Sequence, residues 1–342
     1  MKRLKGLLIL GLLLAGAGRA FAGNGGGDPF DFLFIDAGAR SVGMGGAYTA
    51  LANDANALQY NPGGLGMEKS YEATFMHNVH IEGVSQDYVA VAAPFDAGGM
   101  HHGVSVNFNY LKFADTTRTT YASPNGTGAS FGINDLAVAA GYGLTVVENV
   151  SLGASLKYLR ESIDNGSING TVFDVGGLFT VPALPRLSLG LAVQNIGPDQ
   201  KFQKVSNNPG REHMPVNIRG GAAYGFALPD WNMDNTLAVD VAKERNSDTV
   251  VGVGVESIVM KMLAIRFGYN SRNSVGAGVS VGVGWVAPSF NIDYAIVPMG
   301  DLGYSNRISV SYRWGQANGK MAAAPKSING LQTLMPTSVV AK

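Results

Sequence analysis

The stretch at residues 275–285 reads VGAGVSVGVGW and alternates with a period of two. Apolar residues hold every second position, and glycine or serine holds each position between them. Successive side chains of a β-strand point to opposite faces. The pattern therefore predicts a strand with one apolar face and one small or polar face, with Val279 facing lipid and Ser280 facing inward if the strand lies in a membrane.

The same alternation spreads outward from this stretch over most of the chain. About fourteen such segments lie between residues 71 and 314, and most approach the roughly 10 residues that a tilted membrane strand needs. The clearest of them cover residues 104–110, 152–160, 187–194, 216–226, 237–243, 263–270, 290–296 and 307–314.

Alternation fits both a secreted β-sandwich and a membrane β-barrel, because each buries one face of its strands. Three features favour the barrel: charges in mid-strand on the polar faces, aromatic residues near strand ends, and unequal connections. The connections after the third, fifth and seventh strands (113–130, 161–169, 197–213) are predicted to be long, and those after even strands short. The polar residues expected to face the lumen are Lys157, Arg219, Asp240, Arg266, Asp293, Arg307 and Arg313.

Composition narrows the class of protein further. Of the 342 residues, 46% are apolar, only 15% are charged and 47 are glycine. The charged share lies well below the roughly 25% of an ordinary soluble domain. With 25 basic against 25 acidic residues, the chain lacks the positive charge that nucleic-acid binding requires, and without cysteine it has no disulfide or thiolate metal site.

The N-terminus predicts export. Residues 1–22 have the charged start, short apolar core and small-x-small cleavage site of a signal peptide. No later stretch has the roughly 20 apolar residues of a membrane helix. We therefore predict an all-β protein of the bacterial outer membrane, surrounded by lipid: a transmembrane antiparallel β-barrel of about fourteen strands over residues 70–314, with a disordered tail at 315–342.

The segment before the first strand does not alternate. Residues 36–66 read DAGARSVGMGGAYTALANDANALQYNPGGLG, which is rich in glycine and alanine. The runs at 38–40, 43–47, 52–57 and 61–65 resemble the N-terminal signature of the FadL/PorV group of outer-membrane proteins, which includes the PorV/PorQ and UPF0164 families. The final strand at 303–312 also resembles the closing strand of that group.

The resemblance implies a fourteen-stranded barrel whose lumen is closed by an N-terminal plug, here residues 23–69. Glycines would let the plug backbone pass close to the wall. We expect Arg40 to pair with a wall charge such as Asp240, Asp293 or Arg307, and Asp54 to do so less readily. The predicted plug residues are Arg40, Gly43, Gly45, Gly46, Asp54, Asn61 and Pro62.

The sequence predicts no enzyme, no cofactor and no metal site. The GVSVG run at 278–282 matches a nucleophile elbow, but it lies inside an alternating strand instead of at a strand-to-helix turn. The histidines lack the spacing of a metal site, because His77 and His80 lie three apart on a predicted strand and point to opposite faces.

Two classes of function stay open, besides a structural or adhesive role. The FadL branch implies passage of hydrophobic small molecules, such as fatty acids, past the plug. The PorV branch implies a barrel that docks proteins of a secretion system. The short chain is closer to the PorV and UPF0164 side, whereas a plug is common to both; we place transport slightly ahead.

Overall fold

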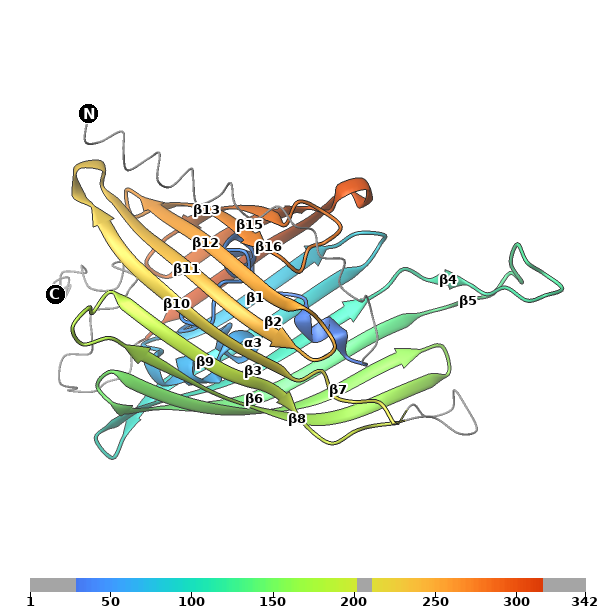
Figure 1. Ribbon diagram of the computed structural model, residues 1–342, viewed down its shortest axis with the longest axis horizontal. Helices are drawn as coiled ribbons and strands as arrows, with labels where there is room; N and C mark the ends of the chain where they lie inside the picture. Colours follow the sequence, from blue (N-terminus) through green and yellow to red (C-terminus); the bar gives the residue numbers. More distant parts are fainter. Residues whose placement is uncertain (1–28, 202–210, 316–342) are drawn as a thin grey trace, which may run out of the picture.

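The computed structural model describes residues 29–201 and 211–315, and within them fourteen antiparallel strands close into one barrel (Figure 1). The predicted fold class is confirmed. The strands of the barrel are β1 (Tyr71–Val79), β2 (Ser85–Ala97), β3 (Met100–Lys112), β6 (Ile133–Val147), β7 (Val150–Ile163), β8 (Gly166–Thr180), β9 (Leu187–Ile196), β10 (Asn217–Leu228), β11 (Met233–Glu244), β12 (Thr249–Val259), β13 (Leu263–Asn270), β14 (Val279–Val286), β15 (Phe290–Pro298) and β16 (Tyr304–Trp314).

The barrel closes where its first strand meets its last. β1 pairs with β16 from Tyr71 opposite Trp314 to Val79 opposite Asn306, and its other edge pairs with β2. Every barrel strand thus has two neighbours, so no backbone edge faces lipid. The rings of Tyr71 and Trp314 stack at 5.9 Å on the outside of this seam.

Alternation sorts the side chains between lipid and lumen. In β14, Val279, Val281 and Val283 are exposed on the outer face, and Ser280 and Gly282 are covered on the inner face. An apolar exterior on a closed antiparallel barrel is the architecture of a protein that spans the bacterial outer membrane.

The predicted strand at 275–285 is wrong at its start. Strand β14 begins at Val279, because Gly278 has a φ of +75° that breaks the extended backbone. Residues 275–278 therefore belong to the loop, although their side chains continue the alternation.

Connection lengths differ between the two ends of the barrel. One end, the short-turn end, has tight links such as residues 98–99 and 148–149; the other, the long-loop end, carries residues 113–132 and 197–216. The predicted long connection at 161–169 is wrong. β7 and β8 continue to a two-residue turn at Asp164 and Asn165, where Asp164 has a φ of +54°.

The remaining elements are short. In Figure 1 the hairpin of β4 (Thr116–Thr117) and β5 (Ser130–Phe131) projects beyond the barrel at the long-loop end. None of the described helices is long and apolar enough to cross a membrane. The predicted signal peptide and nearly all of the predicted tail lie outside the described residues. The helices are η1 (Asp31–Phe34), α2 (Ala39–Gly43), α3 (Ala57–Tyr60), η2 (Pro62–Met67), η3 (Pro229–Trp231) and η4 (Gly300–Leu302).

Candidate functional site

Residues 29–70, which we call the luminal segment, run through the inside of the barrel (Figure 1). At the long-loop end, the backbone N–H of Phe30 donates to Glu161 of β7 over 2.8 Å. At the short-turn end, Ser151 of β7 donates to the carbonyl of Gly63 over 2.5 Å. The segment thus spans the lumen from one end to the other before it enters β1.

Glycines set how closely the luminal segment approaches the wall. A Cβ added at Gly43 would lie 3.2 Å from the Cα of Gly282, and one added at Gly63 would lie 2.6 Å from the Cα of Gly177. Gly45 and Gly46 have φ of +64° and +72°, a conformation that L-residues rarely adopt. A side chain at Gly63 would therefore clash with the wall backbone, and one at Gly43 or at Gly282 would force a small shift of its neighbour.

Asn61 and Pro62 fix the turn before η2. The side-chain amide of Asn61 donates to the carbonyls of Thr49 and Gly177, both at 3.0 Å, while its oxygen accepts from the N–H of Gly63. Pro62 begins η2, where its missing N–H costs nothing. One asparagine therefore joins two parts of the segment to β8.

Arg40 pairs with a wall carboxylate, but not with a predicted one. Its guanidinium donates to both oxygens of Glu256 on β12, at 2.8 and 2.9 Å, instead of to Asp240 or Asp293. The prediction missed Glu256, although it shares the inward parity of Gly252 and Gly254 along its strand.

The carboxylate of Glu256 joins a chain of charges. Arg266 of β13 lies opposite it in the ladder and donates to it over 2.7 Å. The same guanidinium donates to Asp293 of β15, also over 2.7 Å. All three wall residues are buried, so each charge is held by a partner that offsets its loss of hydration.

Within the described chain, Asp54 pairs with no wall charge. It accepts a hydrogen bond of 2.5 Å from the hydroxyl of Tyr48 and lies 3.9 Å from Arg40, both within the luminal segment. The same hydroxyl accepts from Arg40 over 3.0 Å, so Tyr48 links the two charged side chains. Asp54 therefore stabilises the fold of the segment itself.

Arg219 and Asp240 form the second anchor. Asp240 of β11 accepts from the N–H groups of Tyr48 and Thr49 at 3.1 and 2.9 Å, and from Arg219 of β10 at 2.9 Å. Arg219 also donates to the carbonyl of Gly46 over 3.0 Å. Two of the other predicted lumen-facing residues have a carboxylate partner: Lys157 pairs with Asp174 at 2.8 Å, and Arg313 lies 4.0 Å from Glu72. Arg307 contacts no carboxylate of the described chain.

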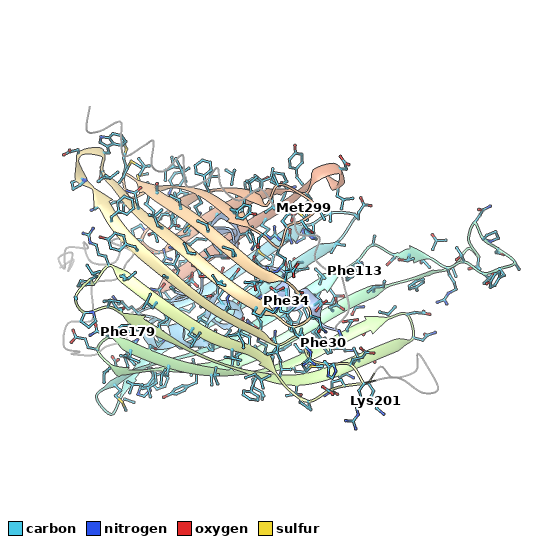
Figure 2. All side chains as sticks on the ribbon, viewed as in Figure 1. Phe30, Phe34, Phe113, Phe179, Lys201 and Met299 are labelled. Atoms are coloured by element: carbon cyan, nitrogen blue, oxygen red, sulfur yellow. The ribbon has the colours of Figure 1, made fainter. Side chains whose placement is uncertain are left out.

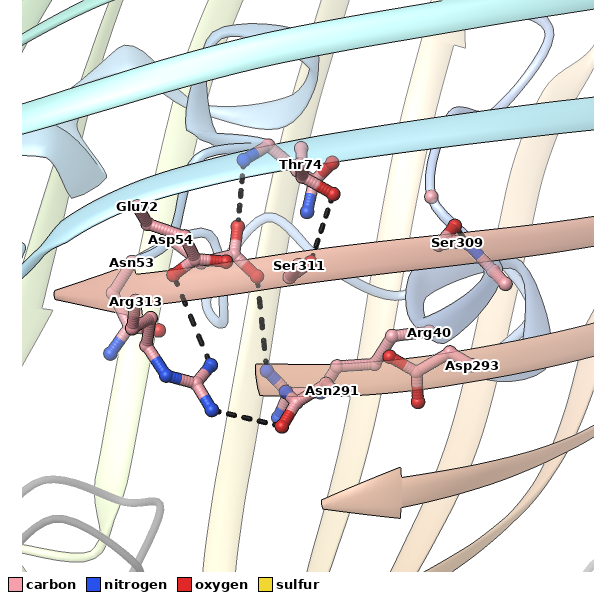
Figure 3. A pocket seen from close by; sticks show the side chains of 13 residues that line it. Arg40, Asn53, Asp54, Glu72, Thr74, Asn291, Asp293, Ser309, Ser311 and Arg313 are labelled. Atoms are coloured by element: carbon pink, nitrogen blue, oxygen red, sulfur yellow. Dashed lines mark hydrogen bonds and ion pairs between the residues drawn. The ribbon is translucent and has the colours of Figure 1, made fainter. Parts of the chain in front are cut away.

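A polar cavity of about 50 Å³ separates the luminal segment from β1, β15 and β16 (Figure 3). Asp54, Glu72, Asn291 and Arg313 line it near the short-turn end. Its volume suits a few water molecules. Its small volume and polar lining do not suit a hydrophobic solute.

An apolar compartment lies near the long-loop end. Phe30, Phe32 and Leu33 of the luminal segment fill it and are almost fully buried, and Phe30 and Phe113 both carry labels at this end in Figure 2. We did not predict this compartment from the sequence, although Leu159 of β7 and Ile168 and Val172 of β8 are large apolar residues at inward positions toward this end. Its wall consists of Leu111, Ala137, Leu159, Ile168, Val172 and Met214, with Val84 and Phe113 packed beside them.

The described residues contain no group of three or more histidine or acidic side chains placed to hold a metal ion. The chemistry that they display is charge pairing, close backbone contact and apolar packing around the luminal segment.

Comparisons with known proteins agree with this geometry. The sequence profile of an uncharacterised protein family, UPF0164, matches residues 17–314. The toluene transporter TodX of Pseudomonas putida is similar in structure, with 12% identity, a TM-score of 0.55, and coverage of 81% of this chain and 97% of TodX. A Pseudomonas aeruginosa FadL homologue aligns with 12% identity and a TM-score of 0.47, over 78% of this chain and 96% of its own. No curated protein matches the sequence.

Proposed function

Because this chain belongs to the uncharacterised protein family UPF0164, whose profile spans the barrel and the luminal segment, we propose a function from its geometry. The protein is an outer-membrane barrel that passes hydrophobic, fatty-acid-like small molecules from outside the cell, and the luminal segment is its plug. It is not an enzyme.

The observation that carries this proposal is the apolar compartment at the long-loop end, which faces outside in outer-membrane barrels. A lumen that passes only water or ions is expected to be lined with polar side chains instead of large apolar ones. Burial of each such side chain of the plug contributes about 1.5–3 kcal/mol, an amount that a hydrophobic solute can replace when it takes the same place. The compartment is thus a binding site that the plug occupies until a solute competes for it.

A solved structure of similar fold supports passage of a hydrophobic small molecule. TodX is a toluene transporter, and its solved structure covers most of this chain. The low identity makes this an analogy of fold, so the solute is argued from the compartment itself.

Uptake of labelled dodecanoate by a Gram-negative host that lacks its own fatty-acid channel tests the proposal. We expect Leu159→Ser, inside the compartment, to lower uptake several-fold because it places a hydroxyl against the solute. The matched control Leu156→Ser lies on the outer face of the same strand, where Leu156 is 60% exposed, and should leave uptake unchanged. Equal uptake by cells with and without the barrel would refute transport.

One observation favours a second function, the docking of exported or secretion-system proteins. The β4–β5 hairpin projects from the long-loop end, and Tyr121 near its tip is fully exposed. A docking barrel predicts that deletion of residues 116–131 abolishes partner binding and leaves dodecanoate uptake unchanged, whereas Leu159→Ser leaves partner binding intact.

A further inference from the structure

Arg307 is a buried cation without an ion pair. It lies on the inner face of β16, and only 5% of the residue is exposed. Its guanidinium donates one hydrogen bond, to the hydroxyl of Ser305 over 3.0 Å, and its Nε has no hydrogen-bond partner. Among the described residues, no carboxylate oxygen lies within 4.0 Å of it.

Among the described residues, every other arginine or lysine on the inner faces of the strands has a carboxylate partner, which makes Arg307 an exception in this wall. A buried charge that lacks a partner is costly, so a protein that keeps one usually has a use for it. The paired cations are Arg40 and Arg266 with Glu256, Arg219 with Asp240, Lys157 with Asp174, Arg272 with Glu244, and Arg313 with Glu72.

The nearest groups on the wall carry no negative charge. Asn78 of β1 and Ala295 of β15 flank Arg307 in the two ladders. His80 shares the hydroxyl of Ser305 at 2.8 Å, and burial, followed by the charge of Arg307, lowers the pKa of His80 to about 4, so it is neutral at pH 7.

On the luminal segment, Asp36 and Tyr60 have partners other than Arg307. Tyr60 donates its own proton to the carbonyl of Ala37 over 2.8 Å. Asp36 lies 3.8 Å from Arg272, which offsets its charge. Arg307 therefore keeps a positive charge that no described acidic group neutralises by direct contact.

A row of amides connects this cation to the apolar compartment. Asn78 donates to Gln86 of β2 over 3.2 Å, and Gln86 donates to Asn109 of β3 over 3.0 Å. Two residues beyond Asn109 along β3 lies Leu111, which belongs to the compartment. Three strand spacings separate β16 from β3, or about 14 Å along the wall. An extended alkyl chain can reach across that distance.

We propose that Arg307 is the anion-binding group of the lumen, and that it holds the carboxylate of an amphipathic solute whose apolar chain enters the compartment of Leu111 and Leu159. The planar guanidinium offers two parallel N–H groups, which match the two oxygens of a carboxylate. The inference rests on the proposed function and adds a statement about solute selectivity. The barrel prefers amphipathic anions to neutral hydrocarbons.

Binding to the detergent-solubilised, full-length barrel tests the inference without transport. The probes are dodecanoate, the neutral dodecanol, and acetate, which has the carboxylate without the chain. We expect dodecanoate to bind at least about tenfold more tightly than dodecanol, because its carboxylate forms charge-assisted hydrogen bonds that a neutral hydroxyl cannot match. Acetate should bind far more weakly than dodecanoate.

The variant Arg307→Gln should remove the preference for dodecanoate over dodecanol and leave dodecanol affinity unchanged. Arg307→Lys, which keeps the charge and loses the planar fork, should keep part of the preference and covers the case in which the glutamine variant does not fold. The control Arg160→Gln removes an exposed arginine from the outer face of β7 and should keep the full preference.

The outcomes separate the inference from the proposed function. Equal affinity of the unmodified barrel for dodecanoate and dodecanol would overturn the anion site and leave hydrophobic binding in place. A full preference retained by Arg307→Gln would also overturn it, as would a full preference retained by Arg307→Lys if the glutamine variant does not fold. If neither amphiphile binds, the proposed function fails, and the inference fails with it.

Discussion

Glu256 is the residue on which the charge pairing between the luminal segment and the wall depends. Its carboxylate accepts from Arg40 of the segment and from Arg266 of β13. Loss of one partner from a buried ion pair typically costs about 3–5 kcal/mol, because the remaining charge stays buried.

We expect Glu256→Gln to lower the free energy of unfolding in lipid vesicles by about 3 kcal/mol for that reason. Urea titration measures it. The control Glu148→Gln changes an exposed turn carboxylate and should have no comparable effect. Identical urea midpoints for the two variants would show that the Glu256 network contributes nothing to stability.

Glu68, between η2 and β1, gives the barrel a pH dependence. Burial, and then the charge of Glu72, raise its pKa well above 4.5; Asp54 adds to this rise and Arg313 opposes it. The folded state therefore holds the proton more tightly than the unfolded chain does. The stability that this proton contributes is complete below the unfolded pKa and is lost as the pH rises from there toward the folded pKa.

Glu68→Gln removes this titration. The variant should therefore unfold at a higher urea concentration than the unmodified barrel at pH 8, and at nearly the same concentration at pH 4. Unfolding curves at the two pH values measure the difference. A variant that is no more stable than the unmodified barrel at pH 8 would contradict the assignment.

These residues also mark the limit of prediction at this scale. The sequence predicted that Arg40 pairs with the wall, since a buried arginine needs a partner. It did not predict Glu256, because the choice among inward carboxylates depends on how far the luminal segment enters the barrel. Arg307 was predicted to face the lumen, but its lack of an ion pair among the described residues is visible only when all the neighbours are placed.

At the scale of the element, β14 shows how the strand start changes an energetic expectation. Val279 is the first residue of the strand, at the long-loop end, whereas Val283 lies near its middle. An arginine on the lipid face costs about 2–4 kcal/mol at the bilayer midplane and about 0–1 near the interface.

Val283→Arg should therefore destabilise the barrel by about 2–4 kcal/mol, and Val279→Arg by about 1 kcal/mol or less. Reversible unfolding in lipid vesicles measures both. Equal penalties would show that the strand sits at a different depth, and a harmless Val283→Arg would show that the register is off by one residue.

The strands were predictable because a two-residue period is a local property. The positions at which the strands begin and end were harder to predict. The alternation at 275–278 continues through a loop, since Gly278 bends the backbone without any change in the side-chain pattern. The two-residue turn at 164–165 was predicted as part of a long loop, because β7 and β8 continue beyond the expected strand length.

At the scale of the molecule, the barrel and the luminal segment depend on each other. A fourteen-strand barrel is wider than the eight-strand size whose own side chains fill the interior. Many inner-wall positions here are glycine, alanine or serine, which leave room inside that width. The luminal segment supplies the missing volume, and its glycines let it do so.

From this complementarity we infer that residues 38–65 close the lumen and that solutes pass when this plug moves. Single-channel recording in planar bilayers tests the inference by comparison of the intact barrel with a variant that lacks residues 38–65. We expect a nearly silent intact barrel and large, steady ion conductance from the deletion variant. An intact barrel that conducts ions as freely as the deletion variant would contradict the assignment of residues 38–65 as a plug.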